Sequence, residues 1–202
     1  MSTFESAAVR SGRRVSEASV AWTIGTSTLA VLLGAAGGSL VLLAFGAVGY
    51  IDALGSVALA HHFRHGLRNL DLEDRFEQRA HRIVTVGLLV VGLTTVVTSV
   101  VRLLVGGSAD PSIAASITAG VSLVVLAMLS ARKRVIASRI PSSALRADGH
   151  LSAVGAMQAA VALVGIVATR RLGWNWADAV AALVVGCVAV ALGVQSRRAA
   201  HA

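Results

Sequence analysis

Three features of this 202-residue chain predict an all-α integral membrane protein, folded as a bundle of six transmembrane helices. Hydrophobic residues make up 55% of the chain and charged residues 14%, a balance typical of membrane proteins. The apolar residues gather in six runs of 18 residues or more, about the length that crosses the hydrocarbon core of a bilayer. The links between the runs are alternately short and long, and the long ones are rich in arginine.

Each predicted helix is an apolar run with at most two charged residues, as a spanning helix requires. Short links rich in glycine or aromatic residues follow the first, third and fifth runs, and glycine favours a break there. The longer links, His61–Arg82 and Arg132–His150, follow the second and fourth. The runs are Ser19–Gly37, Ser39–Ala60, Ile83–Val105, Ser112–Ala131, Leu151–Thr169 and Ala177–Val194.

The basic residues predict the orientation of the helices. Of the 18 lysines and arginines, 15 lie at the N-terminus, in the two long links or in the C-terminal tail. Positively charged loops stay in the cytoplasm, so both termini are expected there. The sequence then divides into a cytoplasmic segment (1–18), one six-helix transmembrane domain (19–194) and a cytoplasmic tail (195–202). We interpret the chain as a multi-pass protein of the plasma membrane, encoded by a GC-rich bacterial genome.

The partners follow from where these charges lie. Net charge is +8, but it sits in juxtamembrane loops, so we expect contact with anionic lipid headgroups and no nucleic-acid binding. Only eight residues follow Val194. Because no cytoplasmic dimerisation domain is then expected, we predict a homodimer formed through the membrane helices, with other membrane proteins as further candidate partners.

Asp52 is the first candidate functional residue, because it stands alone inside the second apolar run. A carboxylate at this depth costs several kcal/mol and usually faces a bundle interior or a water-filled path. It marks an ion or proton site, or else it stays protonated or hydrogen-bonds a neighbouring helix. Antiparallel helices at about 1.5 Å per residue place Asp52 level with Ser152 and Gln158. Those oxygen-bearing groups suit a hard ion or a proton better than zinc.

Three further candidate metal ligands lie at predicted helix ends. Asp148 precedes the fifth run, where its carboxylate would cap the helix or meet an arriving cation. His61 and His65 stand four residues apart on one helical face, a spacing that suits metal ligands, although an interfacial segment has the same composition. At the opposite end, Asp178 is level with Arg102, which predicts a salt bridge or, alternatively, a transport ligand. No catalytic motif is present, so an enzyme is not expected.

Two segments carry a resemblance to a known family. Ser143–Gly155 (SALRADGHLSAVG) and Gly173–Val184 (GWNWADAVAALV), together with six helices and a carboxylate in the second, resemble the membrane domain of the cation diffusion facilitators. The resemblance covers Val20–Val194 and is closest to short relatives without the cytoplasmic C-terminal domain. It implies a secondary transporter that moves a divalent cation out of the cytoplasm, with no bound cofactor beyond that transported ion.

The resemblance also implies a ligand set from which this chain departs. The family binds its metal, usually zinc, with two residues four apart on the second helix and two four apart on the fifth. Those positions here hold Val48 and Asp52, and Leu151 and Gly155. Zinc takes about four ligands, and three of the four are missing. We therefore expect transport coupled to protons through Asp52, or a transport-inactive relative that serves as a structural or accessory subunit of a larger membrane assembly.

Overall fold

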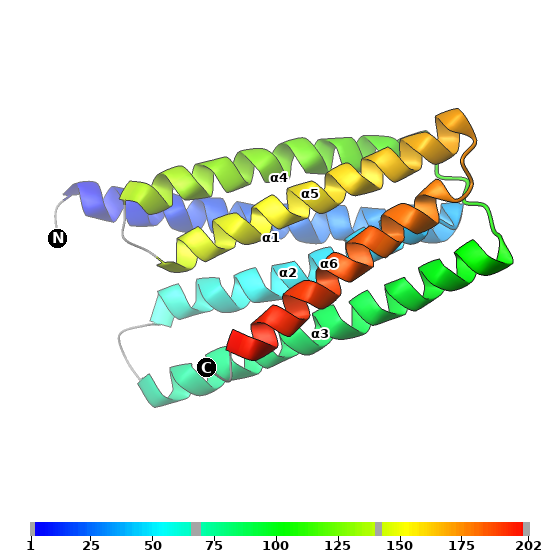
Figure 1. Ribbon diagram of the computed structural model, residues 1–202. Coiled ribbons are helices and arrows are strands. Elements are labelled where there is room, and N and C mark those ends of the chain that lie inside the picture. Colours follow the sequence, from blue (N-terminus) through cyan, green and yellow to red (C-terminus); the bar gives the residue numbers. More distant parts are fainter. Residues whose placement is uncertain (1–2, 66–69, 140–142, 200–202) are drawn as a thin grey trace.

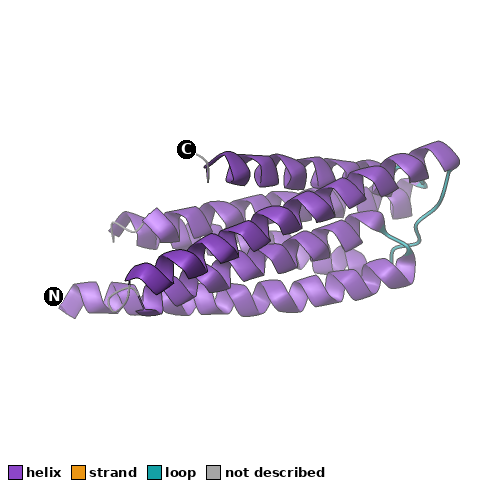
Figure 2. Cartoon of the chain, turned by 90° about the horizontal axis from the view of Figure 1, so that it is seen from below, coloured by secondary structure: helices purple, strands orange, loops and turns teal. Residues whose placement is uncertain are grey.

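The computed structural model describes the backbone of residues 3–65, 70–139 and 143–199, which form helices and short links without a strand (Figure 2). Side chains are described for residues 15–136, apart from 16, 55 and 58–81, and for 138 and 149–198. The helices are α1 (Thr3–Gly37), α2 (Leu40–His65), α3 (Leu70–Val105), α4 (Ile113–Arg139), α5 (Ser143–Leu172) and α6 (Ala177–Ala199).

The helices run up and down in one bundle, and both chain termini lie at the same end of it (Figure 1). We call this end the terminal end, and the opposite end, with links 38–39, 106–112 and 173–176, the short-link end. α1 packs along α2, α3 along α6 and α4 along α5. α2 also contacts α3, α5 and α6, and its Val41, Leu42 and Val48 are among the most deeply buried side chains. It is therefore the central helix.

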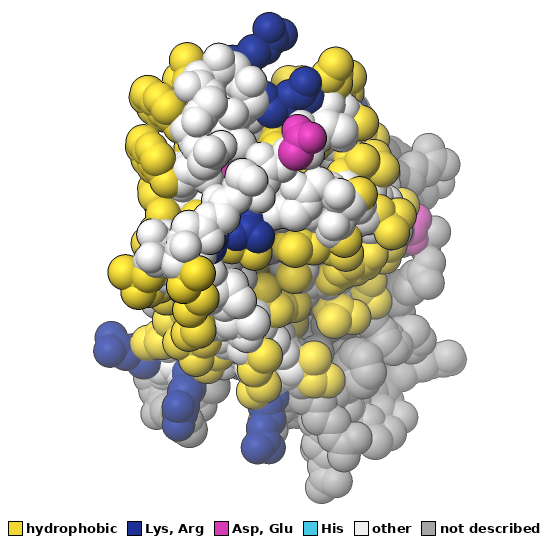
Figure 3. All heavy atoms as spheres, turned by 90° about the vertical axis from the view of Figure 1, so that its right-hand side faces the viewer, with side chains coloured by type: hydrophobic (Ala, Val, Ile, Leu, Met, Phe, Trp, Pro, Cys, Tyr) yellow, Lys and Arg dark blue, Asp and Glu magenta, His cyan; other side chains and the backbone are white. Residues whose placement is uncertain are grey.

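Among the residues with described side chains, five helices contain an apolar stretch long and hydrophobic enough to cross a membrane: Glu17–Gly37, Arg82–Val105, Ile113–Ile136, Gly149–Leu172 and Ala177–Arg198. The described apolar part of α2 is Leu40–Leu54. Large aliphatic side chains such as Leu104, Val164 and Ile83 are more than half exposed, and apolar side chains surround the rim of the bundle seen from the short-link end (Figure 3). An apolar outer surface of this kind suits lipid. The chain is a multi-pass helical membrane protein.

Glycines shape two of the short links. Gly38 has a φ of 62° and Gly106 a φ of 83°, left-handed conformations that L-residues with a side chain rarely adopt. Behind Gly38, the Ser39 N–H donates to the Gly34 carbonyl over 2.9 Å, and the Gly106 N–H donates to the Arg102 carbonyl over 3.0 Å. Both bonds satisfy carbonyls at a helix C-terminus. The chain can therefore reverse within a few residues at this end.

The long links are mostly helical, which corrects the predicted boundaries at the terminal end. α3 begins at Leu70 instead of Ile83, and α5 at Ser143 instead of Leu151. The segment 1–18, predicted to precede the first helix, belongs to α1 from Thr3 onward. Alanine, arginine, glutamate and glutamine favour helix nearly as well as leucine does, so a helix continues past the end of its apolar run. An apolar run marks the lipid-facing length of a helix and not its ends.

Candidate functional site

A polar network at the short-link end joins α2, α3 and α6. Asp178, in the first turn of α6, is fully buried, accepts a hydrogen bond from the Ser39 hydroxyl and accepts another from the Leu40 N–H over 2.7 Å. Arg102 lies 3.4 Å from the same carboxylate and donates to the Gly38 carbonyl over 2.6 Å. The predicted Arg102–Asp178 pair is confirmed. These contacts hold the start of α2, the end of α3 and the first turn of α6 together at the short-link end.

A second polar region is a small cavity inside the bundle, bounded by α1, α2, α4 and α5. Asp52 lines it from α2, together with Ser56 one turn further along the helix. Ser19, Thr23 and Ser27 line it from α1 at spacings of four residues, which places their hydroxyls on one face of that helix. The cavity has a volume of about 30 Å³. Because one water needs roughly 10–15 Å³ measured in this way, the space suits one small ion or one or two waters.

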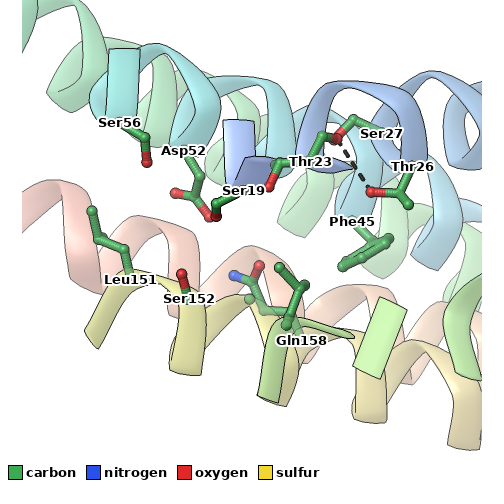
Figure 4. A pocket seen from close by; sticks show the side chains of 13 residues that line it. Ser19, Thr23, Thr26, Ser27, Phe45, Asp52, Ser56, Leu151, Ser152 and Gln158 are labelled. Atoms are coloured by element: carbon green, nitrogen blue, oxygen red, sulfur yellow. Dashed lines mark hydrogen bonds between the residues drawn. The ribbon is translucent and has the colours of Figure 1, made fainter. Parts of the chain in front are cut away.

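α5 closes the cavity opposite Asp52. Ser152, Gly155 and Gln158 line it from this helix. Figure 4 shows the Asp52 carboxylate pointing from α2 toward Ser19, and the Ser152 hydroxyl and Gln158 amide pointing toward it from α5. The prediction that Asp52 faces the interior, level with Ser152 and Gln158, is confirmed. Leu151 and Gly155, at the ligand positions that the resemblance implies, also line the cavity and offer no donor atom.

The amide of Gln158 is the least satisfied polar group in the cavity wall. Its side chain is 3% exposed, and its Nε2 is buried without a hydrogen-bond partner. A buried donor left unpaired costs about 1–3 kcal/mol. The same amide presents an oxygen, so the group can either donate to a water or coordinate a cation through that oxygen. The predicted position of Gln158, level with Asp52, therefore agrees with its place in the cavity wall.

Lys133 is the residue that the sequence interpretation missed. It was counted among the charges of the Arg132–His150 link, but it lies within α4 and is 0% exposed. Its Nζ donates to the hydroxyls of Ser19 and Ser152, each over 2.9 Å, and both hydroxyls line the Asp52 cavity. A buried ammonium at this depth is costly and usually functional or paired. The wall of the Asp52 cavity is therefore hydrogen-bonded to a lysine ammonium from α4.

A sequence signal for Lys133 does exist. Ser122, Leu126, Ser130 and Lys133 follow one another at spacings of four, four and three residues, so they share one face of a helix, and all four are buried. The neighbouring Arg132 and Arg134 are exposed. Ending the fourth helix at Ala131 concealed this pattern, because the lysine then appeared to belong to a solvated link.

The remaining candidates, Asp148, His61 and His65, belong to helices α5 and α2. Asp148 does not cap α5, because that helix begins five residues earlier, at Ser143; its side chain lies outside the described ones. His61 and His65 belong to the last turns of α2, and their side chains likewise lie outside the described part. Among the described residues, no group of three or more His, Cys, Asp or Glu side chains could hold a metal ion.

Comparison with protein-family models and with curated proteins gives no match. The assignment of function therefore depends on the geometry of the cavity.

Proposed function

We propose that this protein is a secondary transporter of a small cation, with Asp52 as the group that carries the ion or the coupling proton. One observation carries the proposal: an interior carboxylate faces a cavity of about 30 Å³ whose other polar groups are hydroxyls and an unpaired amide. Intramembrane carboxylates in such positions mark ion pathways and proton relays. The helical bundle around the cavity supplies the dry walls that a transport site needs.

The donor set favours a hard ion. Hydroxyl, amide and carboxylate oxygens suit protons, alkali cations and magnesium, whereas zinc prefers imidazole and thiolate ligands. The divalent cation that the resemblance implies would find one carboxylate among the described lining residues. We therefore expect weak zinc binding, and a proton or a hard cation as the ion that reaches Asp52.

The experiment that tests the proposal is ion flux into proteoliposomes at defined pH, with sodium, magnesium, manganese and zinc in separate arms and an interior pH dye. Wild type is compared with Asp52→Ala and with empty liposomes. Flux of one ion that needs Asp52 supports transport. Wild-type flux equal to that of empty liposomes in every arm contradicts it.

Six membrane crossings with both termini in the cytoplasm belong to the proposal, as does residence in the plasma membrane. The support is the charge asymmetry of 15 to 3 and the common position of both termini at one end of the bundle (Figure 1). Reporter fusions placed after Gly107 and after Gly173, both at the short-link end, are expected to report the outside of the cell. A cytoplasmic signal from either fusion would refute the topology.

A homodimer through the membrane helices is also proposed. α3 presents an exposed aliphatic stripe that includes Ile83, Val86, Val90, Leu93 and Val97, a surface that suits lipid or a second copy. Light scattering in mild detergent is expected to give the mass of two chains after subtraction of the detergent. A single-chain mass at every protein concentration would count against the dimer.

A transport-inactive structural or accessory subunit is the second candidate. Lys133 favours it, because its ammonium bonds two hydroxyls of the Asp52 cavity and so brings to the cavity wall a positive charge, as a bound metal would. In that case we expect an ion flux equal to that of empty liposomes. The protein is then expected to co-purify with a membrane partner in stable stoichiometry.

A further inference from the structure

The ammonium of Lys133 bonds two hydroxyls that line the same cavity as the Asp52 carboxylate. Ser19 and Ser152 line the Asp52 cavity, and both accept hydrogen bonds of 2.9 Å from Lys133 Nζ. Ser19 lies on α1, Ser152 on α5 and Lys133 on α4, so the ammonium joins three helices at the part of the cavity nearest the terminal end. Any cation that uses these hydroxyl oxygens as ligands competes directly with Lys133.

We propose that Lys133 is a tethered cation that competes for this site, and that the ion admitted in its place is a small monovalent cation of the size of sodium or lithium. The inference rests on the proposed function and specifies its substrate class. The ion binds at Asp52, Ser19, Ser152 and Gln158 once the ammonium has left the two serines.

Charge balance within the bundle supports the exchange. Asp52 and Lys133 together are neutral when both are ionised, and an added cation would leave uncompensated positive charge in a poorly solvated space. Displacement of the ammonium leaves one negative charge, which one monovalent ion neutralises. A divalent ion would again leave an excess of one charge. The cavity volume of about 30 Å³ likewise admits a dehydrated ion and excludes an organic substrate.

From its position on α4, the Lys133 ammonium can move from the two serines to the terminal end of the bundle. Lys133 lies six residues before the end of α4 at Arg139, and its neighbours Arg132 and Arg134 are exposed, so this turn of the helix lies close to the terminal end. A lysine stem of four carbons can carry its head from a buried position to such an interface. Lys133 can therefore leave the serines without unfolding α4, and its return would expel the bound ion.

Gln158 provides an independent indication of a ligand. Its amide is buried, directed into the cavity and without a hydrogen-bond partner on Nε2. A group that only packed the helices together would be expected to bond across to one of them. The unpaired Nε2 is a donor and suits a water that accompanies the ion, whereas the amide oxygen is the atom that would bind the cation itself.

Calorimetric titration of the detergent-solubilised full chain with sodium chloride, lithium chloride or magnesium chloride tests the proposal, with choline chloride holding the ionic strength constant. Lys133→Gln removes the charge and keeps the ability to bond Ser19 and Ser152, and Lys133→Met is a second variant in case one of them fails to fold. Both are expected to bind sodium or lithium at least tenfold more tightly than wild type. Arg134→Met, which removes an exposed charge from the same turn, should match wild type.

The double variant Lys133→Gln with Asp52→Asn should lose the gained affinity. Sodium and lithium affinities equal to wild type in both Lys133 variants would overturn the proposal, and a larger gain for magnesium would overturn the monovalent assignment. Failure here is distinguishable from failure of transport. If Asp52→Asn abolishes flux while the Lys133 variants bind like wild type, only the competition is refuted. If the Lys133 variants bind tightly but no variant transports, only transport is refuted.

Discussion

Asp52→Asn is expected to abolish cation flux while leaving the bundle folded. The amide has the size of the carboxylate and can hydrogen-bond to the cavity wall, but it can carry neither a charge nor a coupling proton. Asp52→Ala should lose flux as well, because it removes the same charge. Proteoliposome flux measures the first effect, and thermal unfolding in detergent shows that each variant is folded.

Ser56→Ala is the matched control, since Ser56 lines the same cavity one turn away on α2 and carries no charge. It should retain most of the flux. If Asp52 instead only joins the helices, Asn should transport like wild type, and Ala should destabilise the bundle by roughly 0.6–2 kcal/mol, the range for interhelical hydrogen bonds in membranes. That pair of results would remove Asp52 from the transport mechanism.

Asp178→Ala is expected to cost about 3 kcal/mol of unfolding free energy, the largest stability effect among the described polar residues. The change removes the carboxylate that accepts hydrogen bonds from the Ser39 hydroxyl and the Leu40 N–H. It also removes the ion-pair partner of Arg102. The value is set toward the low end of the range for broken buried pairs, because the Arg102 side chain is 23% exposed and keeps some solvation. Unfolding in mixed micelles of a mild and a denaturing detergent measures it.

Asp178→Asn should fall between Ala and wild type, because its carbonyl oxygen can still accept one of these bonds. Asp110→Ala provides the control, since Asp110 is an exposed carboxylate at the same end of the bundle, and its loss should change stability by no more than about 0.5 kcal/mol. Equal stability of Asp178→Ala and wild type would show that water replaces the network without cost.

The sequence predicts those features of this protein that depend on depth in the membrane. Apolar length places the helices, and antiparallel counting at a fixed rise places Asp52 beside Ser152 and Gln158 and Arg102 beside Asp178. Both pairs of neighbours are found in the structure. Depth is a one-dimensional property, so it can be counted along the chain without knowledge of how the helices pack.

The sequence did not predict which way a side chain faces around its helix axis, or where a helix begins and ends. Lys133 was assigned to a solvated link because the apolar run ends before it, yet α4 continues and turns that side chain inward. Asp148 was predicted to cap α5 or to meet an arriving cation, and the capping role is wrong because α5 starts earlier. The use of Asp178 to cap α2 also went unseen, because it requires α6 to lie against the start of α2, and nothing local in either segment specifies that contact.

The Asp178 contact has a consequence for the order in which the chain is assembled. Asp178 is separated by 138 residues from Leu40 and by 139 from Ser39, which it bonds. Chains emerge from the ribosome N-terminal part first, so α1 and α2 enter the membrane long before α6 is synthesised. Until then the first turn of α2 lacks the acceptor for its N–H group. The central helix of the bundle is therefore completed by the last one to be translated, and a chain that stops before α6 lacks the carboxylate that bonds the Leu40 N–H and the Ser39 hydroxyl.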